Sequence, residues 1–255
     1  MMLSLILAAA AAGPAAPVPD PMIALVAGEG SSQCLPDRSL CLDIPAVEGG
    51  EADAALLRVS SPGAEAASLS LPDLGETETA TLWPHLIAGG RDGGARRYLV
   101  GILTGQSAMY SGGGGSASHL HLLELHGVPA VPALGGEALV VPWEGSLMIR
   151  ACFSEKDMKD RLEACHDEYD FGATLAAAPA GADAFPTLSY RAVATAFPRT
   201  SRRSTDNSEK PLERADLVRA QDPACTYDRI LRYDPATARY EMDRPAPDCS
   251  DYTTP

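Results

Sequence analysis

The sequence lacks features that would point to a membrane or nucleic-acid-binding protein. It contains no apolar run of the roughly 20 residues that a membrane-spanning helix needs. Basic residues are in deficit, since 20 Lys and Arg stand against 34 Asp and Glu, and the formal net charge is −14. Such a surface repels phosphate backbones, so we expect no nucleic-acid partner. The densest basic group is Arg199, Arg202 and Arg203, but Asp206 and Glu209 lie nearby in the sequence, which favours a solvated loop.

The motifs of common catalytic sites are also missing. The sequence has no phosphate-binding G-x-x-x-x-G-K-[ST] loop and no G-x-G-x-x-G dinucleotide motif. It has no G-x-S-x-G nucleophile motif either, because the segment 105–109 (GQSAM) lacks the second glycine. Only five histidines are available for acid–base chemistry. We therefore expect a non-enzymatic protein rather than an enzyme.

The N-terminus has the features of an export signal. Residues 1–12 (MMLSLILAAAAA) are almost wholly apolar, and Ala10 and Ala12 precede Gly13 at the A-x-A spacing of a cleavage site. We predict a signal peptide and Pro/Ala-rich leader over residues 1–20, and a single domain over 24–255 with no membrane span after cleavage. No Lys or Arg precedes the apolar run, and the alternative is a disordered tail on a cytosolic protein.

Six cysteines support export, because disulfides persist in oxidising compartments. No C-x-x-C motif occurs, which makes a cysteine zinc site unexpected. The cysteines fall into three pairs that are each close in sequence, so the simplest pairing is sequential. The predicted disulfides are Cys34–Cys41, Cys152–Cys165 and Cys225–Cys249. The Ala-rich composition and the single asparagine, Asn207, suggest a bacterial source, and the expected location is periplasmic or extracellular.

Short strand-like segments separated by glycine and proline indicate a mainly β fold. The chain has 23 Gly and 21 Pro, which interrupt the segments at short intervals. This pattern is typical of antiparallel sheets in a sandwich or propeller-like meander with little helix. The predicted strands are 55–60, 67–71, 79–87, 97–104, 119–126, 138–142 and 188–197. One helix of two or three turns is predicted over 211–220.

The segment 227–243 predicts a β-hairpin with a defined register. Asp234-Pro235 begins a turn. Placing Tyr233 opposite Tyr240 also brings an ion pair and an apolar pair into register, as cross-strand pairing prefers. Extended outward, the same register brings Cys225 close to Cys249.

Two further segments have alternative interpretations. Residues 147–153 and 161–171 favour a second hairpin, while Ser154 and Asp157 resemble a capping box and favour a helix from residue 154. Residues 112–118 (GGGGSAS) favour a flexible loop between two strands over a domain linker.

The segment HLHLLELH, residues 119–126, is the best candidate for a metal site. In a strand, His119 and His121 share one face, whereas Glu124 and His126 lie on the other unless a bulge at residues 122–123 resets the phase. With such a bulge, three imidazoles and a carboxylate would meet, a set that suits zinc, copper, manganese or iron. The alternative is an amphipathic strand whose leucines form the core and whose polar residues face solvent.

The spacing of Gly113, His119 and His121 is similar to the first cupin motif. Glu124 comes earlier than the glutamate of that motif, and no second histidine motif follows. The resemblance covers about a dozen residues, so we do not carry the activity of that family over to this chain.

A pair of carboxylates, Glu168 and Asp170, shares a face of a predicted strand. Paired carboxylates can bind calcium or perform acid–base chemistry. Without a loop of calcium-ligand spacing, a solvated strand face is the favoured interpretation.

These observations favour a non-enzymatic exported protein that binds a protein or polymer of the cell envelope through loops on a disulfide-braced scaffold. The first alternative is a metal-dependent enzyme or metal carrier that uses His119 and His121 with a divalent metal. The second is a small-ligand binder, which a deep apolar pocket would favour.

Overall fold

The computed structural model describes residues 20–45, 55–75, 77–92, 94–178 and 185–255. Apart from Asp20, the predicted leader lies outside these residues. The fold is mainly β, with antiparallel strands in two sheets, two short helices and three disulfides, as the sequence predicts. Within the described residues, no helix is long and apolar enough to cross a membrane.

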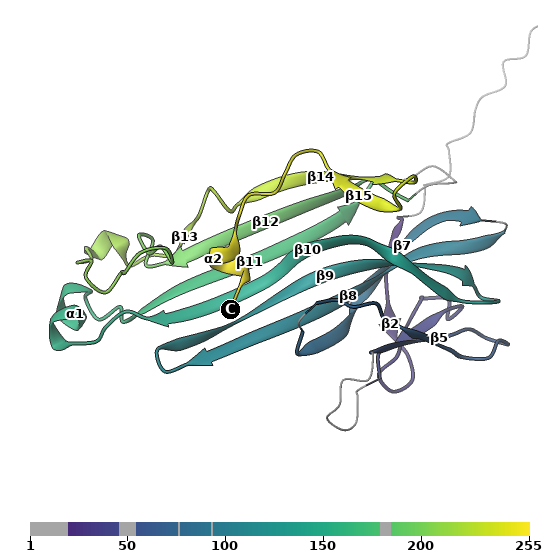
Figure 1. Cartoon of the computed structure of the whole chain (residues 1–255), viewed down its shortest axis with the longest axis horizontal. Coiled ribbons are helices and arrows are strands. Elements are labelled where there is room, and N and C mark those ends of the chain that lie inside the picture. The colour runs from purple at the N-terminus through teal and green to yellow at the C-terminus, as the bar shows by residue number, and fades with distance from the viewer. Residues whose placement is uncertain (1–19, 46–54, 76, 93, 179–184) are drawn as a thin grey trace, which may run out of the picture.

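A large sheet forms the body of the molecule, with long strands running along its length (Figure 1). Its order is β1-β7-β8-β9-β10-β11-β12-β14-β15, and β13 pairs with β12. The strands are β1 (Met22–Ala24), β7 (Thr79–Asp92), β8 (Ala95–Tyr110), β9 (Gly113–Val128), β10 (Ala133–Arg150), β11 (His166–Ala177), β12 (Leu188–Phe197), β13 (Ala220–Gln221), β14 (Tyr227–Asp234) and β15 (Arg239–Met242).

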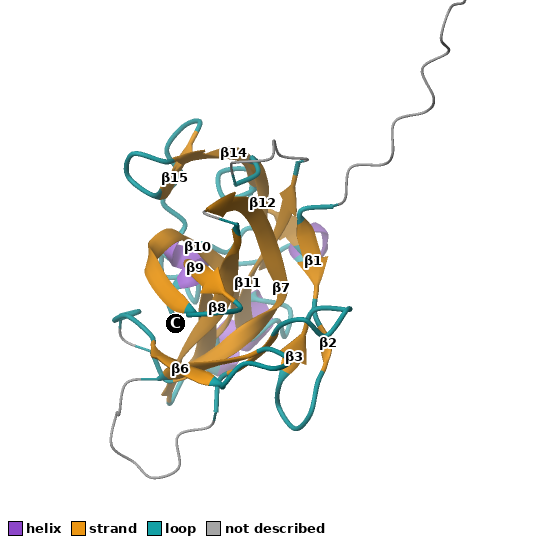
Figure 2. Ribbon diagram, turned by 90° about the vertical axis from the view of Figure 1, so that its right-hand side faces the viewer, coloured by secondary structure: helices purple, strands orange, loops and turns teal. Residues whose placement is uncertain are grey.

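A small sheet from the N-terminal part of the chain lies against β7–β9, as the view along the large sheet shows (Figure 2). Its strands, in order, are β2 (Val26–Ala27), β3 (Gln33–Cys34), β4 (Cys41–Asp43), β5 (Leu56–Ser60) and β6 (Ala67–Ser70). The first disulfide, Cys34–Cys41, links β3 to β4.

Two apolar clusters hold the layers together, and β9 contributes to both. Leu120 and Leu122 belong to a cluster shared with β10, β11, β12, β14 and β15, while Leu123 and Leu125 belong to one shared with the small sheet. A strand that is buried on both faces needs apolar residues at consecutive positions. The adjacent leucines therefore reflect burial on both faces rather than a bulge in β9.

The register confirms this alternation. Pairing of β8 with β9 runs without interruption from Leu99–Glu124 to Tyr110–Gly113. The irregularity near residues 122–123 lies on β10, where Leu139 pairs with Leu122 and Glu137 with Leu123. The bulge that we considered at residues 122–123 is thus absent from β9.

The glycine-rich segment 112–118 is not the predicted flexible loop. A turn at residues 111–112 is followed directly by β9, whose first residues pair with β8 on one side and β10 on the other. A Cβ atom at Gly113, where φ is 154°, would lie 1.9 Å from the carbonyl oxygen of Met148. Glycine here allows the neighbouring backbone to approach closely.

The C-terminal hairpin has the predicted register. Tyr233 pairs with Tyr240, Arg232 with Glu241, and Leu231 with Met242. The Cys225–Cys249 disulfide closes its open end.

Of the predicted helix over 211–220, only one 3₁₀ turn forms, η1 (Arg214–Asp216). Leu212, within this segment, is buried, and its backbone N–H donates to the carbonyl of Asp160. This contact ties the segment to the last residue of the helix between β10 and β11. The other helix in this part of the chain is α2 (Ser250–Thr253), which packs against β10 and β11.

Candidate interaction site at the Phe153 loop

The predicted metal ligands are divided between the two faces of β9. His121 is buried, its Nδ1 atom lies 2.5 Å from Glu137 Oε1, and its Nε2 atom lies 3.0 Å from Thr104 Oγ1. Both ring nitrogens of His121 are therefore engaged by protein groups. His119, two residues earlier in β9, is partly buried on the same face. This burial lowers the pKa of His119, with a smaller contribution from the charge of His121.

Glu124 lies on the opposite face of β9, where its partners are Arg97 and Tyr233. Its Oε1 atom accepts a hydrogen bond of 2.7 Å from Arg97 Nε, and its Oε2 atom accepts one of 3.3 Å from the Tyr233 hydroxyl. The Arg97 guanidinium also lies over the Phe185 ring. Glu124 thus ties the C-terminal hairpin to the middle of the large sheet. His126 lies further along β9, opposite Ala133.

The structure does not bring His119, His121, Glu124 and His126 together around one point. In the described part of the chain, no group of three or more His, Cys, Asp or Glu side chains is arranged to hold a metal ion. The carboxylates of Glu168 and Asp170 do share a face, and both accept hydrogen bonds from the Arg219 guanidinium. That arrangement is an ion-pair cluster on the sheet surface.

A different feature stands out at one end of the large sheet. The connection between β10 and β11, residues 151–165, contains the helix α1 (Glu155–Asp160) and presents exposed apolar side chains. We call this segment the Phe153 loop. The exposed fractions are 65% for Phe153, 47% for Met158 and 41% for Leu162. Exposed large apolar residues that are grouped together often mark a binding surface.

The loop combines the two alternatives that the sequence left open. Strands β10 and β11 form the predicted hairpin, with Arg150 opposite His166. The connection between them contains the helix, which begins with the predicted capping box of Ser154 and Asp157. The competing patterns were both correct because they apply to different parts of the segment.

Local interactions fix the backbone around Phe153. The Asp157 carboxylate accepts hydrogen bonds of 2.9 Å from the N–H groups of Phe153 and Ser154. These contacts, with the Ser154 hydroxyl, hold the pKa of Asp157 below its usual range. The Arg150 guanidinium lies 5.2 Å from the centre of the Phe153 ring and donates to the Cys152 carbonyl. The ring is therefore held in place although most of its surface is exposed.

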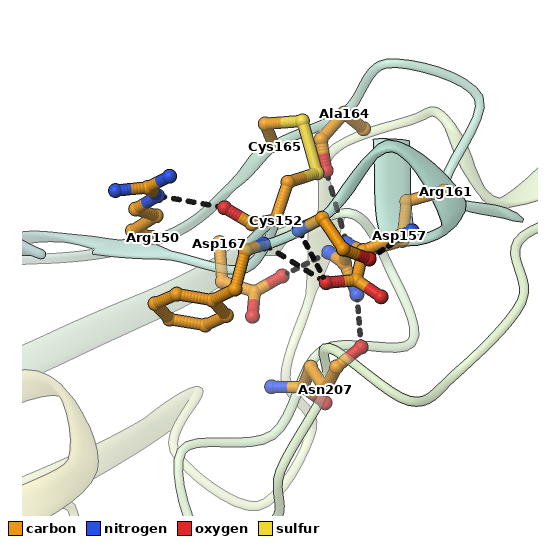
Figure 3. Close-up of a disulfide and its surroundings, with 10 residues drawn as sticks. Arg150, Cys152, Asp157, Arg161, Ala164, Cys165, Asp167 and Asn207 are labelled. Carbon is orange, nitrogen blue, oxygen red and sulfur yellow. Dashed lines mark hydrogen bonds and ion pairs between the residues drawn. A yellow bond between two sulfur atoms is a disulfide. The ribbon is translucent and has the colours of Figure 1, made fainter. Parts of the chain in front are cut away.

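The loop is anchored to the sheet by the disulfide and by a buried ion pair (Figure 3). Cys152 bonds to Cys165, and Arg161 Nη2 lies 2.6 Å from Asp167 Oδ1. Arg161 also donates to the carbonyl oxygens of Ala164 and Asn207. These contacts connect the end of α1 to β11 and to the polar loop 199–208.

The polar loop 199–208 also forms hydrogen bonds with β11, next to the Phe153 loop. The Ser201 hydroxyl donates to Asp167 Oδ1 at 2.5 Å, and Asn207 Nδ2 donates to the Tyr169 hydroxyl at 3.3 Å. A shallow groove of about 300 Å³ lies between the two loops, and its lining includes Arg150, Phe153, Tyr169, Arg203 and Asn207. The polar side chains in this lining lie beside the exposed aromatic ring.

Our sequence interpretation did not identify Phe153 as a candidate site residue. A signal was present, because Phe153 precedes the capping box and Met158 occupies the fourth helical position. Apolar residues at these two positions often pack together as a hydrophobic staple. The pattern alone does not reveal that α1 has no buried residue, which leaves both side chains at the surface.

Comparison with protein families, curated proteins and solved structures finds no match to this chain. The three disulfides indicate a protein of an oxidising compartment.

Proposed function

We propose that this protein is a non-enzymatic binding protein, exported to the periplasm or the cell exterior, and that it binds a protein or polymer of the cell envelope through the Phe153 loop. The observation that carries this proposal is an exposed Phe153 ring on a backbone fixed by a capping box, a disulfide and a buried ion pair. Aromatic anchors of this kind contribute much of the free energy of binding in protein interfaces.

The rigidity of the loop favours binding over a purely structural role. Association costs free energy when loops and side chains become ordered, and a loop that is ordered beforehand avoids much of that cost. The Arg161–Asp167 pair and the Cys152–Cys165 disulfide supply this order without covering the Phe153 ring. The neighbouring groove offers hydrogen-bonding groups that can orient a partner.

Export is supported by the three disulfides and by the apolar N-terminal segment. In a bacterium, disulfides persist in the periplasm and outside the cell, which are also the places where the proposed envelope partners are found.

The test is a native pull-down with the oxidised protein as bait and an envelope extract as the source of partners. A component that is retained at high salt is identified by mass spectrometry, purified, and titrated against the wild type and the Phe153→Ser variant. We expect Phe153→Ser to weaken binding by about 30-fold, as the loss of a central aromatic anchor does.

Val131→Ser provides the matched control. Val131 is 76% exposed and lies in the turn between β9 and β10, away from the Phe153 loop. This variant should bind as the wild type does. Equal binding by Phe153→Ser and the wild type, or no specific partner in the extract, would contradict the proposal.

A further inference from the structure

A second groove lies where three turns of the chain meet, and we call it the arginine groove. It has a volume of about 500 Å³ and is lined by the Cys34–Cys41 loop, by Arg91 and residues 94–96 of the β7–β8 hairpin, and by the turn between β9 and β10. Its floor is apolar, because Leu40, Tyr98 and Val128 are each at most 5% exposed. The groove is separate from the Phe153 loop, which connects β10 to β11.

Two positively charged side chains, Arg91 and Arg96, line this groove directly opposite each other. Arg91 on β7 and Arg96 on β8 are a cross-strand pair, and both are exposed. Like charges at such positions repel each other and destabilise a sheet. Among the described residues, the ion pairs include neither arginine. In a chain with a net charge of −14, an opposed pair of cations is an unusual local arrangement.

Among the described residues that line the groove, one is acidic, and it is already engaged in its own turn. Asp37 Oδ1 accepts hydrogen bonds from the Ser39 hydroxyl at 2.7 Å and the Ser39 N–H at 3.0 Å. These bonds, with a smaller contribution from the charge of Arg96, lower the pKa of Asp37. Arg91 uses one amino group to donate to the carbonyl of Gly94 at 2.9 Å, and a guanidinium has further donors that can bind a ligand.

We propose that the arginine groove binds an anionic group, a carboxylate or a phosphate monoester, on a molecule whose apolar or aromatic body covers the floor of the groove. A guanidinium matches the geometry of both anions through paired hydrogen bonds. An anion between Arg91 and Arg96 relieves their mutual repulsion. The relief of this repulsion makes the free energy of anion binding more favourable. The rest of the ligand would lie over the floor of the groove, which Leu40, Tyr98 and Val128 help to line.

The probes are phenyl phosphate and benzoate, with benzyl alcohol as the uncharged analogue. Each is titrated at low ionic strength into the oxidised protein without the predicted leader. Binding is followed by calorimetry and by the shift in unfolding temperature. We expect saturable binding of at least one anion and none of benzyl alcohol. A preference for phenyl phosphate over benzoate, or the reverse, identifies which anion the site takes.

The variants Arg91→Gln and Arg96→Gln test the assignment of the two cations. Each should weaken binding of the preferred anion by about 10-fold or more, the size of one charge-assisted hydrogen bond. Both side chains are exposed, so neither variant should unfold the protein. Arg191→Gln is the control, since it makes the same change in net charge at a 61% exposed side chain on β12.

Three results would overturn the proposal. The first is no saturable binding of either anion, and the second is wild-type affinity in both groove variants. The third is an equal loss of affinity in Arg191→Gln, which would show that the effect follows net charge rather than the groove. Because no envelope extract is used, failure here is distinct from failure of the Phe153 loop to bind a partner.

Discussion

Arg161 Nη2 lies 2.6 Å from Asp167 Oδ1, and their side chains are 0% and 3% exposed. The pair joins the Phe153 loop to the first residues of β11. We expect Asp167→Ala to lower the free energy of unfolding by about 3 to 5 kcal/mol, because it leaves a buried guanidinium without its counter-charge. Urea unfolding monitored by tryptophan fluorescence or circular dichroism measures this change.

The control for this prediction is Asp228→Ala. Asp228 pairs with Arg191 at 3.6 Å, but both side chains are more than half exposed. Its removal should change stability by less than about 1 kcal/mol, as exposed ion pairs do. Similar losses in the two variants would show that the buried pair does not anchor the loop.

His121→Ala tests whether His121 has a structural role. The substitution removes both hydrogen bonds of a buried imidazole and leaves Thr104 and Glu137 without that partner. We expect a loss of about 2 to 4 kcal/mol of stability, whereas His166→Ala, at an exposed position, should have little effect. The same unfolding curves with added zinc test the metal-carrier alternative. Stabilisation of the wild type by zinc that is lost in His121→Ala would support that alternative instead.

Two glycines on neighbouring strands should respond to alanine in opposite ways. A Cβ atom at Gly145 would lie 2.1 Å from the carbonyl oxygen of Tyr252 in α2, whereas at Gly172 it would meet nothing within 4 Å. Gly145→Ala should therefore displace α2 and cost about 1 to 3 kcal/mol. Gly172→Ala should be neutral or stabilise by about 0.5 kcal/mol, because alanine restricts the unfolded chain. Thermal unfolding of the two variants distinguishes these outcomes, and equal stabilities would argue against the docking of α2 on β10.

The depressed pKa of His119 predicts a pH dependence of stability. Burial lowers this pKa below the ordinary value of 6.5 in the native state, so the unfolded state binds more protons just below pH 6.5. Stability should therefore be complete above about pH 6.5 and decline as the pH falls through the window below it. His119→Gln should flatten the curve in that window. An unchanged slope would indicate that other groups cause the decline.

The C-terminal hairpin shows how far local sequence can determine structure. Asp234-Pro235 favours a turn, and the pairing of Tyr233 with Tyr240 follows once that turn is in place. The three disulfides join cysteines that are separated by 24 residues or fewer. All these features depend on residues that are near one another in the chain, so a single sequence was sufficient to predict them.

Features that depend on distant segments could not be predicted in the same way. The adjacent residues Leu122 and Leu123 suggested a bulge, because the sequence does not reveal that the small sheet covers the second face of β9. The glycines of 112–118 suggested a loop, because their close contact with β10 involves residues about 35 positions away. Similarly, Phe153 has the pattern of a helix-capping apolar residue, and only the packing of α1 decides that its ring remains exposed.

The sequence by itself determined the β class, the disulfide pairing and the C-terminal hairpin, because each follows from short-range periodicity, turn chemistry or chain proximity. The tertiary structure alone decided which side chains meet across strands. It covered the second face of β9 with the small sheet, and it joined Arg161 to the polar loop 199–208. Pairing between strands and packing between sheets bring distant residues together, and no local pattern encodes those contacts.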